Sequence, residues 1–355
     1  MSSHRASWSD ATQEKNNASQ IGSARVQRAV FRILPNIFCQ QRFGVGNMPN
    51  IARCKRALPS SNNRASALVS IVMCERLWKI GERVFDVSRH GLIMGVLNVT
   101  PDSFSDHGEF FSADKATEHG LKMATEGAHI IDIGGESTRP GSEPVTVEEE
   151  LRRVIPVVEN LRRMLDVPIS IDTSKAAVAR AAIDAGASIV NDVTGGRGDE
   201  QMLPLIAETK SAVIIMHMQG IPRTMQIQPR YTDVVAEISE FFRQQYACAI
   251  GLTIDPMAIA FDPGIGFGKT LEHNLELLAH LERLRAHDRP LVVGVSRKSF
   301  LAKLIGSPEM SDRLVPGLAL SALLRGRGAD VFRVHDVKEN VYALRVTEAI
   351  LQRAK

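Results

Sequence analysis

From residue 91 to the C-terminus, short apolar segments alternate with longer amphipathic ones, and this alternation limits the folds open to the chain more than any other feature. Eight apolar segments with polar or glycine-rich ends are predicted to be strands, at 92–97, 129–133, 168–172, 188–191, 212–216, 258–262, 291–295 and 330–334. Amphipathic helices are predicted between them, for example at 147–164, 175–185, 232–250 and 271–285, and a last one at 337–352. Eight such units in about 250 residues predict an α/β fold of the (β/α)8 (TIM) barrel type. A doubly wound parallel sheet is the alternative, but nothing in that fold would stop it at eight strands.

Polar side chains stand at or just after the end of every predicted strand. In a (β/α)8 barrel the carboxyl ends of the strands build the active site, so these side chains would share one mouth. Each alone has an ordinary explanation, such as helix capping by Asp172 or a turn at Asp262. Their convergence favours a binding site. The set comprises Asn98, Asp132, Asp172, Asn191, His217, Asp262, Lys298, Arg333 and His335.

Asp172, Asn191 and Asp262 suit the edge of a flat ligand that carries several N–H donors. An ionised carboxylate only accepts hydrogen bonds, whereas an amide both donates and accepts them. This combination predicts recognition of a heterocyclic ring.

A second group of side chains suits an anion. Arg333 and His335 lie two apart on one strand and therefore point to the same side, and the arginine fork matches phosphate oxygens. Lys298 adds a third basic group. Arg139, in the glycine-rich loop after the second strand, is in isolation better explained as a solvated charge.

Two local patterns resemble motifs that the surrounding residues do not support. Residues 264–270 end in Gly-Lys-Thr like a P-loop, but that motif needs a glycine where the chain has Pro263. We therefore interpret this segment as a glycine-rich loop that lets the backbone approach a ligand. His217 could bind a metal, but no cysteine or carboxylate lies nearby at ligand spacing, which favours a role in closing the strand.

The N-terminal part differs from the rest in charge and cysteine content. Residues 1–80 hold 12 of the 43 basic and three of the 40 acidic residues, a net +9 that leaves −6 for the remainder, and they hold three of the four cysteines. No sustained apolar period appears there, so we predict an extension at 1–85, mostly unordered, before a barrel at 86–355. An organellar transit peptide has this composition, but so has a plain extension or a start annotated too early, with Met48 or Met73 as the true start.

The remainder of the chain also excludes several classes of protein. Its net negative charge gives no indication of a basic surface that would bind nucleic acid. No apolar run approaches the roughly 20 residues of a membrane span. Its single cysteine, Cys248, argues against a disulfide framework and fits a reducing compartment. We expect a cytoplasmic protein, or an organellar one if the extension is a transit peptide.

Taken together, the segments resemble dihydropteroate synthases, pterin-binding enzymes of folate biosynthesis. The matching stretches lie at 94–106 (MGVLNVTPDSFSD), 132–141 (DIGGESTRPG), 170–175 (SIDTSK), 191–193 (NDV), 216–220 (MHMQG), 262–269 (DPGIGFGK), 296–299 (SRKS) and 333–337 (RVHDV). The family folds as a (β/α)8 barrel and commonly forms homodimers. Its reaction displaces diphosphate from (7,8-dihydropterin-6-yl)methyl diphosphate with the amine of 4-aminobenzoate, giving 7,8-dihydropteroate.

The resemblance implies a role for each matching residue. Those implied to bind the pterin are Asp172, Asn191, Asp262 and Lys298, with Met216 and Phe267 lining the pocket and Arg333 over the ring. Those implied to meet the diphosphate are Thr138, Arg139, Arg333 and His335. Asn98 would help to hold Mg²⁺ on the leaving group, and Ser299 would contact the carboxylate of 4-aminobenzoate. Those implied to be catalytic are Arg139, Asp172, Lys298, Arg333 and His335.

Elementary chemistry agrees with these roles. Magnesium keeps several waters and needs few protein ligands, so one asparagine with substrate oxygens is sufficient. An arylamine is a free base at neutral pH, so we expect positioning and electrostatics without a dedicated general base. The loops at 101–108 and 138–141 would close over the second substrate. His107 replaces a glycine that the family usually has, which puts the conformation of the first loop in doubt.

Two other functions compete with this one. Pterin-binding methyltransferases share the carboxylate and asparagine pocket but lack the loops at 103–106 and 136–141 and the stretch at 296–298. A non-catalytic pterin-binding barrel is the other alternative, and Asn98, Arg139 and Lys298 argue against it.

Overall fold

The computed structural model of the protein describes residues 75–100, 113–138, 141–221 and 223–353. The prediction that residues 1–85 are mostly unordered therefore falls outside the described residues, except at 75–85. The first active-site loop, with His107, and Arg139 also lie outside them.

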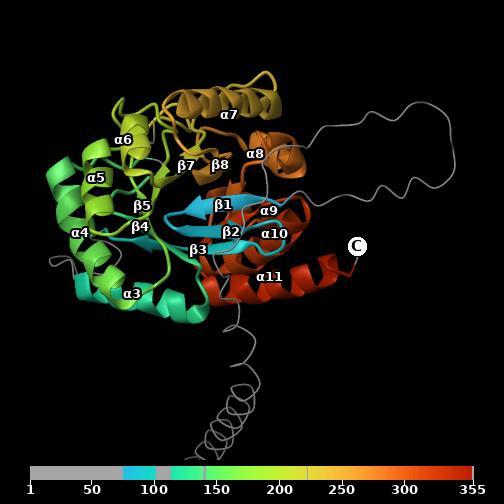
Figure 1. Ribbon diagram of the computed structural model, residues 1–355. Helices are drawn as coiled ribbons and strands as arrows, with labels where there is room; N and C mark the ends of the chain where they lie inside the picture. The colour runs from blue at the N-terminus through green and yellow to red at the C-terminus, as the bar shows by residue number, and fades with distance from the viewer. Residues whose placement is uncertain (1–74, 101–112, 139–140, 222, 354–355) are drawn as a thin grey trace, which may run out of the picture. The chain divides into compact units, whose positions relative to one another are not determined.

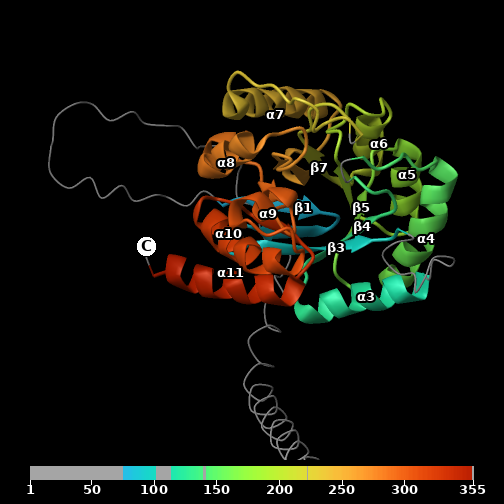
Figure 2. The same cartoon turned by 180° about the vertical axis from the view of Figure 1, so that it is seen from behind.

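Parallel strands form the centre of the described part (Figures 1 and 2). The strands of this eight-stranded sheet are β3 (Leu92–Asn98), β4 (Ile130–Gly134), β5 (Ile169–Asp172), β6 (Ile189–Asp192), β7 (Ala212–Met216), β8 (Ile259–Asp262), β9 (Val292–Val293) and β10 (Val331–Val334). Their order is β8-β7-β6-β5-β4-β3-β10-β9. A parallel bridge between Phe261 and Leu291 joins the two ends. The predicted (β/α)8 barrel is confirmed.

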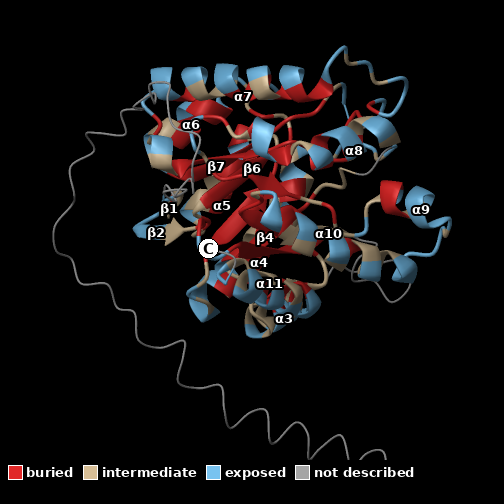
Figure 3. Ribbon diagram, turned by 90° about the vertical axis from the view of Figure 1, so that its right-hand side faces the viewer, coloured by how far each residue is buried: buried red, intermediate tan, exposed pale blue. Residues whose placement is uncertain are grey.

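Helices surround the sheet, with their buried faces toward it and their exposed faces outward (Figure 3). They are α3 (Ala113–Glu126), α4 (Val147–Met164), α5 (Ala176–Asp184), α6 (Met202–Thr209), α7 (Val234–Gly251), α8 (Leu271–Ala279), α9 (Ser299–Ile305), α10 (Leu314–Gly326) and α11 (Val337–Leu351). Side chains of Thr146, Asp233 and Thr270 accept hydrogen bonds from the first turns of α4, α7 and α8. No helix in the described ranges is long and apolar enough to cross a membrane.

One predicted helix, 271–285, is divided in the structure. Helix α8 ends at Ala279, and the short 3-10 helix η2 (Leu281–Leu284) follows; two others, η1 (Pro256–Ala258) and η3 (Ser311–Arg313), occur elsewhere. In a 3-10 helix residues three apart lie on the same side, which lets Leu281 and Leu284 both enter the core. The apolar spacing alone did not distinguish the two helix types.

A β-hairpin precedes the barrel, in a range that the sequence assigned to the extension. Its strands are β1 (Leu77–Ile80) and β2 (Arg83–Asp86), paired antiparallel. Trp78 is fully buried, and its indole N–H donates to the carbonyl of Ala258 at 3.2 Å. The sequence analysis did not predict this hairpin, because two strands of four residues are too short to show a period.

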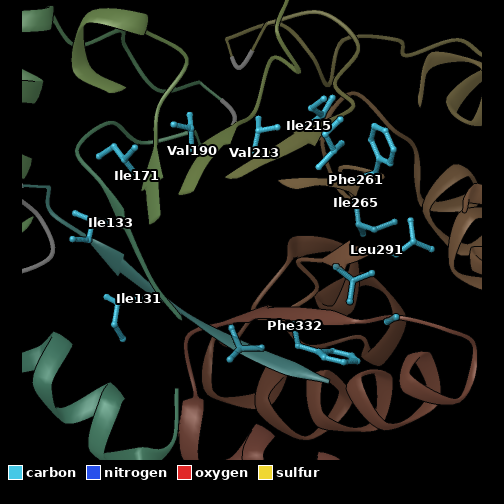
Figure 4. Packing of buried hydrophobic residues seen from close by; sticks show 14 of the residues in the cluster. Ile131, Ile133, Ile171, Val190, Val213, Ile215, Phe261, Ile265, Leu291 and Phe332 are labelled. Atoms are coloured by element: carbon cyan, nitrogen blue, oxygen red, sulfur yellow. The ribbon is translucent and has the colours of Figure 1, made fainter. Parts of the chain in front are cut away.

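The core has two parts, divided by the alternation of side chains along the strands. Outward-facing residues such as Ile131, Ile133 and Phe332 pack against the helices (Figure 4). Inward-facing residues such as Met94 and Ile130 pack with Trp78 in a separate cluster. Toward the carboxyl ends of the strands, the inward positions become polar.

Candidate active site

The polar positions inside the barrel belong to five strands. Asp132 lies on β4, Asp172 on β5, Asn191 on β6, Asp262 on β8 and Arg333 on β10. The residue before each of them is apolar and packs in the core between strands and helices, so the strand period turns these five side chains inward. The four acidic and amide residues are buried, and Arg333 is partly exposed.

Arg333 forms the centre of a charged network. Its Nε donates to Asp132 Oδ2 and its Nη2 to Asp172 Oδ2, both at 2.6 Å. Asn191 Nδ2 donates to the same Asp132 oxygen at 3.2 Å. The opposing carboxylates raise the pKa of Arg333 although burial lowers it, so the guanidinium stays charged. The network holds Arg333 and Asn191 in one orientation.

Asp132 is the member of this network that the sequence interpretation did not assign to a role. It stands at a predicted strand end and begins the matching stretch 132–141, but a buried carboxylate that contacts other protein groups gives no separate signal in a sequence. The structure brings the other predicted inward-facing residues together around it.

Two buried carboxylate oxygens of this network, Asp132 Oδ1 and Asp172 Oδ1, have no hydrogen-bond partner among the described residues. An unsatisfied buried acceptor costs about 1–3 kcal/mol, so a ligand with N–H donors would recover that energy. Burial raises the pKa of Asp172 although Arg333 lowers it. Burial also raises the pKa of Asp262, whose Oδ1 accepts the Gly264 N–H at 2.7 Å.

An apolar wall lies beside these carboxylates. Phe267 and Met216 belong to a small cluster that is separate from the two core clusters and also contains Val193, Met218 and Met225. The Lys298 ammonium lies 4.0 Å from the centroid of the Phe267 ring. Burial, with a further contribution from Arg333, lowers the pKa of Lys298 to about 8. The wall thus carries a cation over an aromatic face.

His335 lies on the loop after β10, and Ser299 begins helix α9, which follows β9. His335 donates its backbone N–H to Ser296 Oγ at 3.2 Å, and its Nδ1 lies 3.2 Å from the same oxygen. Burial, with a contribution from Arg333, lowers the pKa of His335 to about 3, so its imidazole is neutral at pH 7. Ser299 is exposed at the first position of α9. His335 can therefore offer hydrogen bonds to an anion but no charge.

The loop after β4 is fixed at its base by groups that the sequence interpretation did not identify. Lys175 Nζ bridges the carboxylates of Glu136, in this loop, and Glu150, which is fully buried on α4. Arg153 donates to the carbonyl of Gly135 at 2.8 Å. Thr138, at the end of the described part of the loop, is half-buried. Glu150 is one of three consecutive glutamates, and no sequence pattern distinguishes it from the others.

A metal site made by the protein alone is not found among the described residues, where no group of three or more His, Cys, Asp or Glu side chains is arranged to hold an ion. Asn98, the last residue of β3, is half-buried at the mouth of the barrel. One amide oxygen fits Mg²⁺ only if most other ligands are water and substrate oxygens. His217 is not available to a metal through Nδ1, which lies 3.2 Å from Lys269 Nζ.

Comparison with known proteins identifies the family. The model of the pterin binding enzyme family matches residues 94–335. Dihydropteroate synthase of Escherichia coli is 48% identical over 262 residues, covering 74% of this chain and 92% of the relative. A structure of Xanthomonas albilineans dihydropteroate synthase with 4-aminobenzoic acid is 42% identical, with a TM-score of 0.73, and covers 78% of this chain and 99% of that one. Another, in complex with 7,8-dihydropteroate, is 40% identical with a TM-score of 0.70, and covers 78% and 98%.

The chain therefore belongs to the pterin-binding enzymes, a class that its barrel and its inward-facing polar layer also define. Within that class it belongs to the dihydropteroate synthases, transferases that produce dihydropteroate. The fold, the enzymatic activity and the family expected from the sequence are confirmed.

Proposed function

We propose that the polar layer inside the barrel binds the pterin diphosphate substrate and that 4-aminobenzoate attacks from the mouth. The observation that carries this proposal is the pair of buried, unpartnered oxygens on Asp132 and Asp172 beside Asn191. A pterin edge presents several N–H donors and acceptors in one plane, which matches carboxylate and amide groups. The ligands of the Xanthomonas structures, 4-aminobenzoic acid and 7,8-dihydropteroate, support it.

In this proposal the ring lies between the polar layer and the apolar wall. Asp172, Asn191 and Asp262 accept from and donate to its edge. The wall of Met216 and Phe267 covers one face, and Arg333 covers the other. Lys298 donates to a ring acceptor from its place over Phe267.

The reaction breaks the C–O bond between the pterin methylene carbon and diphosphate and forms a C–N bond to the arylamine. Positive charge develops on the methylene carbon as diphosphate leaves, and the carboxylates of Asp172 and Asp262 stabilise it. The free N–H groups of Arg333, together with Thr138, Arg139 and His335, take the negative charge of the leaving group. Mg²⁺, held by Asn98 and the diphosphate oxygens, would supply further charge neutralisation.

The amine needs no general base before it attacks, because it is neutral at physiological pH. After the C–N bond has formed, the nitrogen loses its proton to water or to the departing diphosphate. Ser299, exposed at the start of α9, contacts the carboxylate of 4-aminobenzoate and sets the direction of attack. The protein therefore contributes mainly orientation and electrostatic stabilisation.

The test is release of diphosphate by the full chain with pterin diphosphate, 4-aminobenzoate and Mg²⁺. Arg333→Met should lower kcat/KM by at least about a hundredfold, because it removes an anion donor and leaves two buried carboxylates without their cation. Arg243→Met, at an exposed position on α7, is the matched control and should leave the rate unchanged. Binding of the pterin without diphosphate release in the wild type would instead favour a non-catalytic pterin-binding protein.

We also propose that the chain forms a homodimer through α10 and α11. Tyr342, Val346 and Ile350 follow one another at four-residue spacing on α11, and all three are more than half exposed. Val315 and Leu323 lie on one side of the adjacent helix α10 and are also exposed. Apolar stripes of this kind are typical of protein interfaces. Val346→Glu should convert the dimer to a monomer in light scattering, whereas Lys122→Glu on α3 should not.

The cytoplasm is the compartment that we propose for this enzyme. Cys248, the cysteine in the described part of the chain, is free and exposed, as is expected under reducing conditions.

A further inference from the structure

Lys269 is a buried lysine that the proposed mechanism does not use. It belongs to the segment whose Gly-Lys-Thr ending resembles a P-loop, and only 2% of its surface is exposed. No carboxylate lies within ion-pair distance of its amino group among the described residues. Such burial is costly without compensating contacts, so the contacts that Lys269 does make need an explanation.

The amino group has three polar neighbours, and all of them belong to the loops after β7 and β8. Lys269 Nζ donates to the carbonyls of Phe267 at 2.9 Å and His217 at 3.3 Å, and it lies 3.2 Å from His217 Nδ1. Burial, with a contribution from Lys269, lowers the pKa of His217 to about 2, so the imidazole is neutral. An ammonium donates to all three atoms, and a neutral amine can make the same contacts by accepting from Nδ1–H.

The two loops lie in direct backbone contact where Lys269 joins them. A Cβ atom on Gly264 would lie 2.0 Å from the carbonyl oxygen of His217, and one on Gly268 would lie 2.2 Å from that of Gln219. Both glycines have positive φ, at 65° and 64°. Side chains are therefore excluded from these two backbone contacts. Hydrogen bonds from the Lys269 side chain link the loops, together with those that Gln226 donates to the carbonyl of Gly266 and Tyr231 to that of Gly268.

The linked residues are neighbours of the proposed pterin pocket. Phe267, whose carbonyl Lys269 holds, presents its ring to Lys298. His217, the other residue held, directly follows Met216 of the apolar wall. Lys269 thus contacts one residue of the wall, Phe267, and the residue that follows the other, Met216.

We propose that Lys269 is a positioning residue that fixes the Met216 and Phe267 wall and, through the Phe267 ring, the Lys298 ammonium that binds the pterin. The inference rests on the pterin site proposed above. Loss of the Lys269 contacts should weaken binding of the pterin substrate but not of 4-aminobenzoate. The position that we propose for 4-aminobenzoate, at Ser299, lies at the start of α9 and has no contact with Lys269.

The experiment compares Lys269→Met with the wild type in steady-state kinetics and in calorimetric titration with the pterin diphosphate substrate. Methionine keeps most of the volume and removes the polar contacts. KM for the pterin and its calorimetric Kd should rise at least about tenfold, while KM for 4-aminobenzoate changes less than about twofold. Lys122→Met, at an exposed position on α3, is the matched control and should change neither.

Lys269→Gln keeps an amide donor that can reach part of the network, and it should give an intermediate pterin KM. If Lys269→Met does not fold, the pterin KM of Lys269→Gln tests the inference in its place. Unchanged pterin KM in a folded variant would overturn the inference, and so would an equal loss of affinity for both substrates, which would indicate a general structural role. Failure of the proposed function would look different, because the wild type and Lys122→Met would then release no diphosphate.

Discussion

A single buried carboxylate, Asp132, orients two of the groups that we propose to bind the pterin. It accepts from both Arg333 and Asn191 through one oxygen and leaves its other oxygen unpartnered among the described residues. Removal of one partner from a buried ion pair is much more damaging than removal of a surface pair, because the remaining charge stays desolvated. The orientation of Arg333 therefore depends on Asp132.

Asp132→Asn should lower the free energy of unfolding by about 3–5 kcal/mol, since Arg333 would lose one of its two charged partners in a desolvated position. The pterin KM should rise by at least about tenfold in the same variant. Urea unfolding and steady-state kinetics measure the two effects. Asp255→Asn is the control, because its ion pair with Lys79 is exposed and contributes at most about 1 kcal/mol. Equal stabilities of the two variants would contradict the argument.

The buried carboxylate of Asp172 should give the enzyme an acid limb in its pH profile. Burial raises its pKa above the ordinary value of about 4, and in the binding mode that we propose the ionised form accepts from the pterin edge. kcat/KM for the pterin should therefore fall as the pH is lowered, starting well above pH 4. Asp172→Asn should remove this limb as well as most of the activity. A profile that stays flat down to pH 4 would contradict this assignment.

The raised pKa of Asp172 has the opposite effect on stability, because it favours the folded state at low pH and not at high pH. Because the folded-state pKa lies above the unfolded one, the native state binds more protons between the two values. The contribution of Asp172 to the free energy of unfolding is then fully present below the unfolded pKa and decreases as the pH rises through the folded pKa. The stability difference between wild type and Asp172→Asn should accordingly shrink as the pH rises from 4 to 7, which urea titrations at several pH values would measure.

The loop after β4 depends on contacts made by its neighbours, α4 and the loop after β5. Lys175 connects Glu136 of the loop to the buried Glu150, one of whose oxygens has no partner among the described residues. Burial lowers the pKa of Lys175, but the hydrogen bonds that it donates to both carboxylates outweigh this effect and raise the pKa. This cluster determines where the loop leaves the barrel, and hence where Thr138 lies.

Lys175→Met should reduce kcat/KM about tenfold or more, because Glu150 would remain buried without its cation and the loop base would lose its tether. The rate of diphosphate release should fall by a larger factor than the affinity for the pterin, since we propose that this loop contacts the diphosphate. Calorimetry with the pterin substrate separates the two. Arg180→Met, which removes an exposed ion pair with Glu208, is the control and should behave as wild type.

The sequence predicted most of the strands and helices and the polar side chains at the strand ends, but it did not predict the contacts between those side chains. Strand ends were found because each apolar run stops at a polar residue, as at Asp172 or Asp262. Partners inside the protein were not found, because Asp132, Glu150 and Lys269 are defined by contacts between elements far apart in the chain. The hairpin around Trp78 was missed for the same reason: its burial depends on the bottom of the barrel, which no short segment encodes.

At the bottom of the barrel, the end at which its strands begin, contacts join the β1–β2 hairpin and the residues after it to the C-terminal helices. Asp330 is fully buried and accepts hydrogen bonds from Arg76 Nε at 3.0 Å and from Arg285 Nη1 at 2.7 Å. Arg325 of α10 donates to the carbonyls of Val87 and Ser88. These contacts make residues from about 75 onward part of the folded unit.

Two shortened chains would test this organisation. A chain that begins at Met73 retains Arg76 and Trp78 and should keep the melting temperature and activity of the barrel. A chain that begins at Val87 loses both and should be destabilised by at least about 3 kcal/mol, the typical cost of removing a buried tryptophan. Thermal unfolding followed by circular dichroism distinguishes them. Equal melting temperatures would show that the hairpin is dispensable.

The sheet is closed by one bridge, between Phe261 and Leu291. Every other junction in the described ring is a ladder of paired strands, so this seam is the junction with the fewest strand pairings. The loops that flank the seam carry Phe267 on one side and Lys298 on the other. The contact between the Lys298 ammonium and the Phe267 ring, at 4.0 Å, therefore spans the seam and joins by side chains the two strands that share the fewest backbone pairings.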